Sequence, residues 1–253
     1  MLTSCMFTRI LLLLLISVSA FAQSEGRIET DRPDQTECPF IVKKGYIQAE
    51  IGFNRSTSEY LFPTSLLKYG LSKRFELRYV SVLGLEPGKD ARFQTEAIGF
   101  KWALFQPSGF QSSGWKPRTS VIVHYNWDHQ NRDFSEKNLR GHSIGDVVFT
   151  MQNDFNKRFG IGYNLGTEMH SNGSFEGIYR VAPNMLIGKK GYAYVEVFGR
   201  FPASEFADHS YDAGFAYYVN EDVKLDVSAG QSFLNPEDHY IAVGLSFRFR
   251  VIR

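Results

Sequence analysis

Apolar and polar residues alternate along most of this chain, and that pattern limits what it can fold into more than any other feature. The alternation is clearest near the C-terminal end, where the apolar positions are Ile241, Val243, Leu245, Phe247, Phe249 and Val251. The positions between them are Tyr240, Ala242, Gly244, Ser246, Arg248 and Arg250. Alternate side chains of a β-strand point to opposite faces, so this pattern predicts a strand with one apolar and one polar face.

The same alternation recurs along the chain and predicts an all-β fold of about twelve strands. The other segments are 46–53, 62–70, 75–83, 94–104, 118–127, 143–153, 159–168, 178–187, 192–200, 210–219 and 223–231. Beyond residue 22, no apolar run approaches the ~18 residues of a transmembrane helix, and stripes with helical period are missing. Strands of roughly nine to eleven residues can cross a bilayer when they are tilted.

The first 22 residues are predicted to be a secretory signal peptide. Arg9 supplies the positive charge, the run from Ile10 to Ile16 is apolar, and Ala20-Phe21-Ala22 forms a cleavage site with small residues. Removing 22 of the 253 residues leaves 231, enough for one large all-β domain. The exported chain would keep one cysteine, Cys38, and therefore no internal disulfide.

Alternation alone does not say which face points inward, because soluble β-sandwiches alternate as well. Three observations favour an antiparallel, up-and-down transmembrane β-barrel with lipid outside. About twelve strands enclose an interior wider than the roughly eight-strand size that side chains can fill. The polar face carries charges in mid-strand, and aromatic residues, 15% of the chain, occur near strand ends as in membrane girdles. We therefore predict a Gram-negative outer-membrane barrel at 46–253, with a soluble secreted sandwich as the alternative.

The connectors between the predicted strands alternate in length. Tight turns are predicted at 71–74, 154–158, 188–191 and 219–222, and longer loops at 85–92, 128–142, 169–177, 201–209 and 232–238. Outer-membrane barrels have short periplasmic turns, so we expect both chain termini on the periplasmic side. The long connector 105–117 lies on the side of the short turns and does not fit this rule.

Charged residues of the polar face are predicted to line the lumen. The candidates are Glu50, Arg78, Lys101, Arg118, His124, Glu168, Arg180, Glu196, Asp212, Lys224, Asp226 and Arg248. Their signs are mixed, and the whole chain carries a formal net charge of +1. Because a strongly ion-selective pore favours one sign, we expect weak selectivity or a narrow, salt-bridged interior, and the pairs could equally just fill the barrel. The charge balance also argues against a nucleic-acid partner.

Residues 23–45 precede the first predicted strand and form the densest polar cluster of the chain. Their charged residues include Asp31, Arg32, Asp34 and Glu37, and two prolines exclude a regular strand. One interpretation is a plug that folds into the lumen and pairs with charges there. The interpretation we favour is a rigid periplasmic lead-in to the first strand, because Pro and Asp at this spacing commonly build turns.

A catalytic role has little support in the sequence. Met169 to Gly173 is superficially similar to the His/Ser/Asn constellation of outer-membrane phospholipases, but His170 and Ser171 are adjacent and would point to opposite faces. Asn172-Gly173 instead favours a hairpin turn. The histidines without a motif, which show no metal-ligand spacing, are His124, His129, His142, His209 and His239. We expect no enzyme activity, no metal and no cofactor.

Several motifs resemble an outer-membrane transporter-like family named for a meta-pathway of phenol degradation. The most specific is the segment from Ile28 to Pro39, read as IETDRPDQTECP, followed by KGYIQAE at 44–50. Further matches are LLKYGL at 66–71, RFELR at 74–78, GYNLG at 162–166, DAG at 212–214 and KLDVSAG at 224–230. Cys38 stands where a serine is expected. The resemblance covers nearly all of the exported chain and implies an outer-membrane barrel that moves small, including aromatic, compounds.

The sequence thus predicts a channel for passive passage or binding of small solutes, hydrophobic or aromatic ones included. Its expected partners are membrane lipid and a small solute. A structural or adhesive barrel acting through the surface loop Asp128–His142 is the alternative, and a lipid hydrolase is a remote one.

Overall fold

A computed structural model describes residues 26–57, 59–85, 90–107, 116–127, 143–202 and 207–251. Within these ranges the chain forms twelve β-strands: β1 (Tyr46–Ser56), β2 (Tyr60–Gly70), β3 (Phe75–Leu85), β4 (Arg92–Phe105), β5 (Arg118–Asn126), β6 (Ser143–Asp154), β7 (Phe159–His170), β8 (Phe175–Ile187), β9 (Gly191–Phe201), β10 (Asp208–Tyr218), β11 (Val223–Ser232) and β12 (His239–Arg250). The predicted all-β fold and strand number are confirmed. None of the described residues belongs to a helix long and apolar enough to span a membrane. The predicted signal peptide and the loop 128–142 lie outside the described residues.

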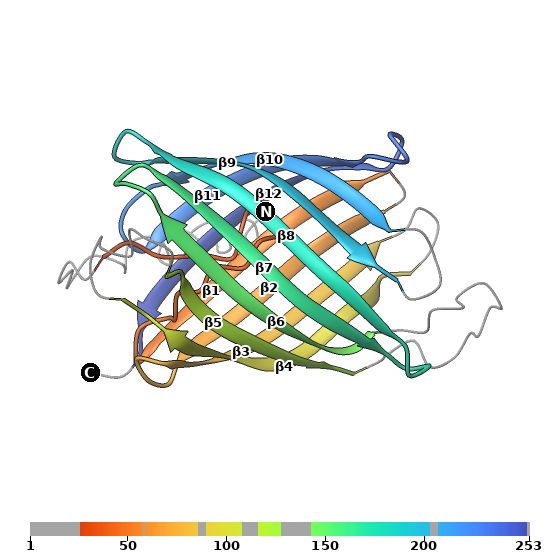
Figure 1. The fold of residues 1–253 in the computed structure, drawn as a ribbon, viewed down its shortest axis with the longest axis horizontal. Helices are drawn as coiled ribbons and strands as arrows, with labels where there is room; N and C mark the ends of the chain where they lie inside the picture. The colour runs from red at the N-terminus through yellow and green to blue at the C-terminus, as the bar shows by residue number, and fades with distance from the viewer. Residues whose placement is uncertain are drawn as a thin grey trace, which may run out of the picture.

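The strands close into an antiparallel, up-and-down barrel (Figure 1). Each strand pairs with its neighbour in sequence, and β12 pairs with β1 from Tyr46↔Arg250 to Ser56↔Tyr240. Closure leaves no strand edge unpaired, which is required of a sheet in hydrocarbon because no water is there to satisfy backbone groups.

The two faces of the barrel are inverted relative to a soluble protein. Outward-facing Leu165 and Val195 are each 58% exposed, whereas inward-facing Glu50 and Lys101 are 0% exposed. Water would disfavour such an apolar exterior, and a lipid surrounding favours it. The soluble-sandwich alternative is therefore wrong.

Exposed aromatic side chains form a band at each end of the barrel. We call the end with the connectors 71–74, 155–158, 188–190 and 219–222 the turn end, and the opposite end the loop end. At the turn end the exposed rings include Phe105, Phe155 and Phe159, and at the loop end Phe175, Phe201 and Phe233. Two such girdles, with aliphatic residues between them, match the two interfaces of a membrane.

The predicted long loop at 169–177 is wrong. The ladder between β7 and β8 continues to Met169↔Phe175, and only 171–174 connect the two strands. Gly173 adopts a φ of 80°, which a residue without Cβ allows, and Ser174 N donates to the Asn172 side chain at 2.9 Å. The Asn-Gly pair thus makes a tight turn at the loop end, so connector length separates the two ends less cleanly than expected.

Candidate functional site: the barrel interior

The barrel interior holds residues 26–45, here called the N-terminal segment. It starts at the turn end, where Ile28 N donates to Glu221 O at 2.7 Å, and returns there, where Gly45 N donates to Gly70 O at 2.8 Å. Along its length, hydrogen bonds join it to β1, β2, β3, β4, β5, β7, β9, β11 and β12. A segment can reach strands all around a closed barrel only from inside, and Figure 1 shows it in red within the barrel outline. The favoured periplasmic lead-in does not account for these contacts.

Asp31 lies at the centre of the strongest contact. Its Oδ2 accepts hydrogen bonds from Lys68 Nζ at 2.9 Å and Arg78 Nη1 at 3.0 Å, and Oδ1 lies 3.2 Å from Lys101 Nζ. Cys38 N also donates to Oδ1, at 2.9 Å. Burial opposes ionisation, but the charges of Lys101, Lys68 and Arg78 hold the pKa of Asp31 well below its usual range. The carboxylate is therefore charged and bound to three cations.

Arg32 reaches toward β1, β11 and β12. Its Nη2 donates to Asp226 Oδ1 on β11 at 3.0 Å, and its backbone N donates to Glu50 Oε2 at 3.0 Å. The guanidinium passes over Gly52 and Gly244, where an added Cβ would lie 2.4 Å from its atoms. Two glycines facing each other across β1 and β12 therefore make room for this side chain.

The deepest part of the segment contacts β9. Gln35 N donates to Glu196 Oε2 at 2.7 Å, and the Thr36 hydroxyl donates to the same carboxylate. Burial and the neighbouring Glu196 carboxylate raise the pKa of Asp34 well above its usual range. Two carboxylates thus lie close together here, whereas three cations converge on Asp31.

The returning part of the segment is held through its backbone. Asn164 accepts from Glu37 N at 2.8 Å, and Ser120 donates to Pro39 O at 2.6 Å. Val42 N then donates to Glu76 Oε2 at 2.7 Å. Because these bonds are made by main-chain groups of the segment, they fix the path of its backbone through the barrel.

Little room remains between the N-terminal segment and β6 to β11. The cavity there has a volume of about 50 Å³, and its lining includes Asp34, Cys38, Tyr192, Tyr218 and Lys224. Small-molecule sites usually measure ~300–1,000 Å³. This cavity has room for a few water molecules.

Nine of the twelve residues predicted to line the lumen contact the segment. They are Glu50, Arg78, Lys101, Arg118, Arg180, Glu196, Lys224, Asp226 and Arg248. The other three have partners on the barrel: His124 with Asp146 at 3.1 Å, Glu168 with Arg200 at 2.7 Å, and Asp212 with Tyr240. All four charged residues singled out in the segment lie inside the barrel.

Lys68, Ser120 and Asn164 also hold the segment but were not among the predicted lumen residues. Lys68 follows the alternation of β2, between Leu67 and Tyr69, so its inward direction could have been found. Ser120 and Asn164 are uncharged, and a search for charges passes over them.

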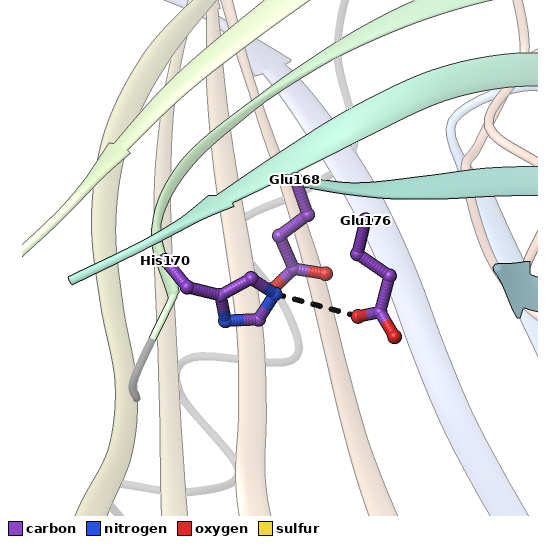
Figure 2. Close-up of side chains that lie close together, drawn as sticks. All are labelled: Glu168, His170 and Glu176. Carbon is purple, nitrogen blue, oxygen red and sulfur yellow. Dashed lines mark ion pairs between the residues drawn. The ribbon is translucent and has the colours of Figure 1, made fainter. Parts of the chain in front are cut away.

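A second polar cluster lies near the loop end, at the junction of β7 and β8. Figure 2 shows Glu168, His170 and Glu176 pointing toward one another, with His170 Nε2 at 3.4 Å from Glu176. Their ligand atoms lie within 4.8 Å of one another, a spacing that a metal ion could use. However, Arg200 Nη1 lies 2.7 Å from Glu168 and 3.3 Å from Glu176, so a guanidinium already supplies the positive charge.

A closed twelve-stranded barrel with an apolar exterior, two aromatic girdles and a charged interior is a transmembrane β-barrel of the outer-membrane type. The chain belongs to the family described as "Putative MetA-pathway of phenol degradation", whose model matches residues 30–249. This confirms the resemblance found in the sequence. No curated protein sequence matches the chain significantly.

Solved structures share the fold at very low sequence identity. An outer-membrane channel from Pseudomonas putida F1, called COG4313, superposes with a TM-score of 0.57 at 8% identity, covering 91% of this chain and 100% of that one. The KdgM porin gives 0.56 at 9% identity, with 80% and 99% covered. The NanC porin gives 0.56 at 9% identity, with 79% and 98% covered.

Proposed function

We propose that the protein is an outer-membrane channel for small solutes, and that the N-terminal segment is a plug that closes its lumen at rest. The observation that carries the proposal is Asp31, whose carboxylate binds Lys68, Arg78 and Lys101 from three adjacent strands. A segment that lay in the periplasm would not bring the Asp31 carboxylate into contact with these three cations inside the barrel. The small cavity left beside the segment supports a closed state, because a solute passing on that side needs the segment to move.

The class of solute is taken from the family. Its name refers to phenol degradation, and the barrels of similar fold are described as a channel and as porins. We therefore propose small solutes, aromatic compounds included. Catalysis fits poorly, because His170 is bound to Glu176 while Ser171 lies in the exposed turn, so the two do not form a base and nucleophile pair.

A disulfide that ties the plug to the wall tests the proposal. A Cβ built on Gly162 would lie 3.1 Å from Thr36 Cγ2, a separation that a disulfide can bridge with little adjustment. The variant is Thr36→Cys with Gly162→Cys, in a Cys38→Ser background that removes the competing thiol. Thr36→Cys in the same background, without the second cysteine, is the matched control.

Planar-bilayer conductance and vesicle swelling are then measured with the disulfide oxidised and reduced. We expect solute passage in the reduced protein and in the control, because a plug held only by non-covalent contacts leaves the lumen part of the time, and loss of passage on oxidation of the double-cysteine variant. Equal passage in both states would refute the plug. No passage in any state, wild type included, would refute the channel and favour a barrel that acts through its surface loops.

A further inference from the structure

The cluster that holds Asp31 is built from three cations on three neighbouring strands. Lys68 pairs in register with Arg78, and Lys101 pairs in register with Glu76, two residues before Arg78. The three side chains are 2%, 4% and 0% exposed and converge on one carboxylate. A plug that only filled space would not need three buried charges at one point.

The three cations differ in the partners that the barrel wall itself gives them. Lys68 forms an ion pair with Glu50, and Arg78 forms one with Glu76 at 3.3 Å. The hydrogen bonds that Lys101 donates in the described structure all go to the plug, namely to Asp31, Cys38 O and Phe40 O. When the plug leaves, Lys68 keeps Glu50 and Arg78 keeps Glu76 and His124, whereas Lys101 loses each of these acceptors.

The shape of the site matches a carboxylate. Asp31 presents both oxygens to the wall: Oδ2 accepts from Lys68 and Arg78, and Oδ1 accepts from Lys101. Donors arranged around both oxygens of a planar group suit a carboxylate better than a spherical ion. A buried cation that loses its partner is strongly disfavoured, so a solute bearing one carboxylate stabilises the cluster once Asp31 has left.

We propose that Lys68, Arg78 and Lys101 bind the carboxylate group of an organic acid passing through the channel, and that Asp31 occupies this site in its place when the plug is closed. The proposal rests on the channel function above and adds the chemical class of the solute. Plug and solute then compete for the same three cations. A carboxylate solute favours release of the plug, and a neutral or cationic solute of equal size does not.

Cys38 reports on this competition. It is the one cysteine among the described residues, and it lies inside the barrel beside Asp31. A maleimide carried on a large polyethylene glycol is too bulky to enter the lumen, so it labels Cys38 only after the plug has moved out. The full-length protein in detergent micelles is labelled in the presence of benzoate, benzyl alcohol or benzylammonium, three solutes of similar size and different charge.

We expect benzoate to increase the labelling rate at least about tenfold, the factor associated with losing one charged hydrogen bond, and the other two solutes to leave it unchanged. Lys101→Met removes the benzoate response, and Lys73→Met, at an exposed turn position, preserves it. Lys101→Gln takes the place of Lys101→Met if the methionine variant does not fold.

Equal rates with all three solutes, or no labelling under any of these conditions, would overturn the proposal. So would a benzoate response that survives loss of the Lys101 charge. These results are distinct from failure of the channel function. A benzoate response without solute passage through vesicles refutes the channel, and passage without a benzoate response refutes only the carboxylate site.

Discussion

Replacing Asp31 by Asn removes the charge that holds the plug while keeping the size of the side chain. Breaking a buried ion pair costs about 3–5 kcal/mol. The low end applies here, because Lys68 keeps Glu50, and Arg78 keeps Glu76 and Glu37, when the Asp31 charge is gone. In the released state Lys68, Arg78 and Lys101 are hydrated in wild type and in Asp31→Asn alike, so the substitution changes the free energy of the closed state only. We therefore expect Asp31→Asn to favour release by about 3 kcal/mol, roughly 150-fold.

The labelling rate of Cys38 by the large maleimide measures this change. When closing is fast compared with labelling, the rate is proportional to the population of the released plug. Asp90→Asn, at an exposed loop-end position, controls for loss of one negative charge. A labelling rate for Asp31→Asn equal to that of wild type would show that the ion cluster does not hold the plug, and the reasoning above would fail.

Three further outcomes are expected. First, burial raises the pKa of Asp34 in the closed state, so the closed state binds its proton more tightly and loses stability as pH rises from the ordinary value of about 4 through the raised one. Cys38 labelling, corrected for the thiolate fraction of a free cysteine peptide, should rise over that range in wild type. The rise should be smaller in Asp34→Asn, in which Glu29, whose pKa burial also raises, still titrates. Second, Gly244→Ala places a Cβ 2.4 Å from the Arg32 guanidinium, and the resulting loss of the ion pair with Asp226 should speed Cys38 labelling by about tenfold. The control is Gly177→Ala, whose Cβ would lie 3.8 Å from its nearest neighbour and which should leave the labelling rate unchanged. Third, Leu165→Arg, on the lipid face in the middle of β7, should lower the free energy of unfolding in vesicles by about 2–4 kcal/mol, and Phe175→Arg at the loop-end girdle by about 0–1 kcal/mol.

The strands could be predicted because period-two alternation is a local property. In β12, Leu245 and Phe247 face out while Ser246 faces in, and this can be read from three consecutive residues. The lipid-facing barrel could also be predicted, because the strands can be counted from the sequence and about twelve of them enclose an interior wider than apolar side chains can fill. The β7–β8 turn was misjudged although Asn172-Gly173 was recognised, because the polar residues beside it extend the ladder as easily as they form a loop.

The path of the N-terminal segment could not be predicted, because it depends on contacts distant in sequence. Asp31 meets Lys101, 70 residues away, and Arg32 meets Asp226, 194 residues away. Turn-forming residues such as Pro33 and Asp34 fit a lead-in and a plug equally well, since both paths bend. Only the three-dimensional register of β2, β3 and β4, which brings three cations to one level, distinguishes the two.

The positive and negative charges that line the lumen can be interpreted differently once their positions on the strands are known. Counting charges averages over β2 to β4, where Lys68, Arg78 and Lys101 converge on one point, and β9 to β11, which carry Glu196, Asp212 and Asp226 together with Lys224. The adjacent residues Asp31 and Arg32 reach charges on different strands, Asp31 the cations of β2 to β4 and Arg32 the carboxylate of Asp226 on β11. Under the carboxylate site proposed above, a solute that displaces the plug is therefore selected by where its charges lie. Net charge, on which the expectation of weak selectivity rested, does not describe that choice.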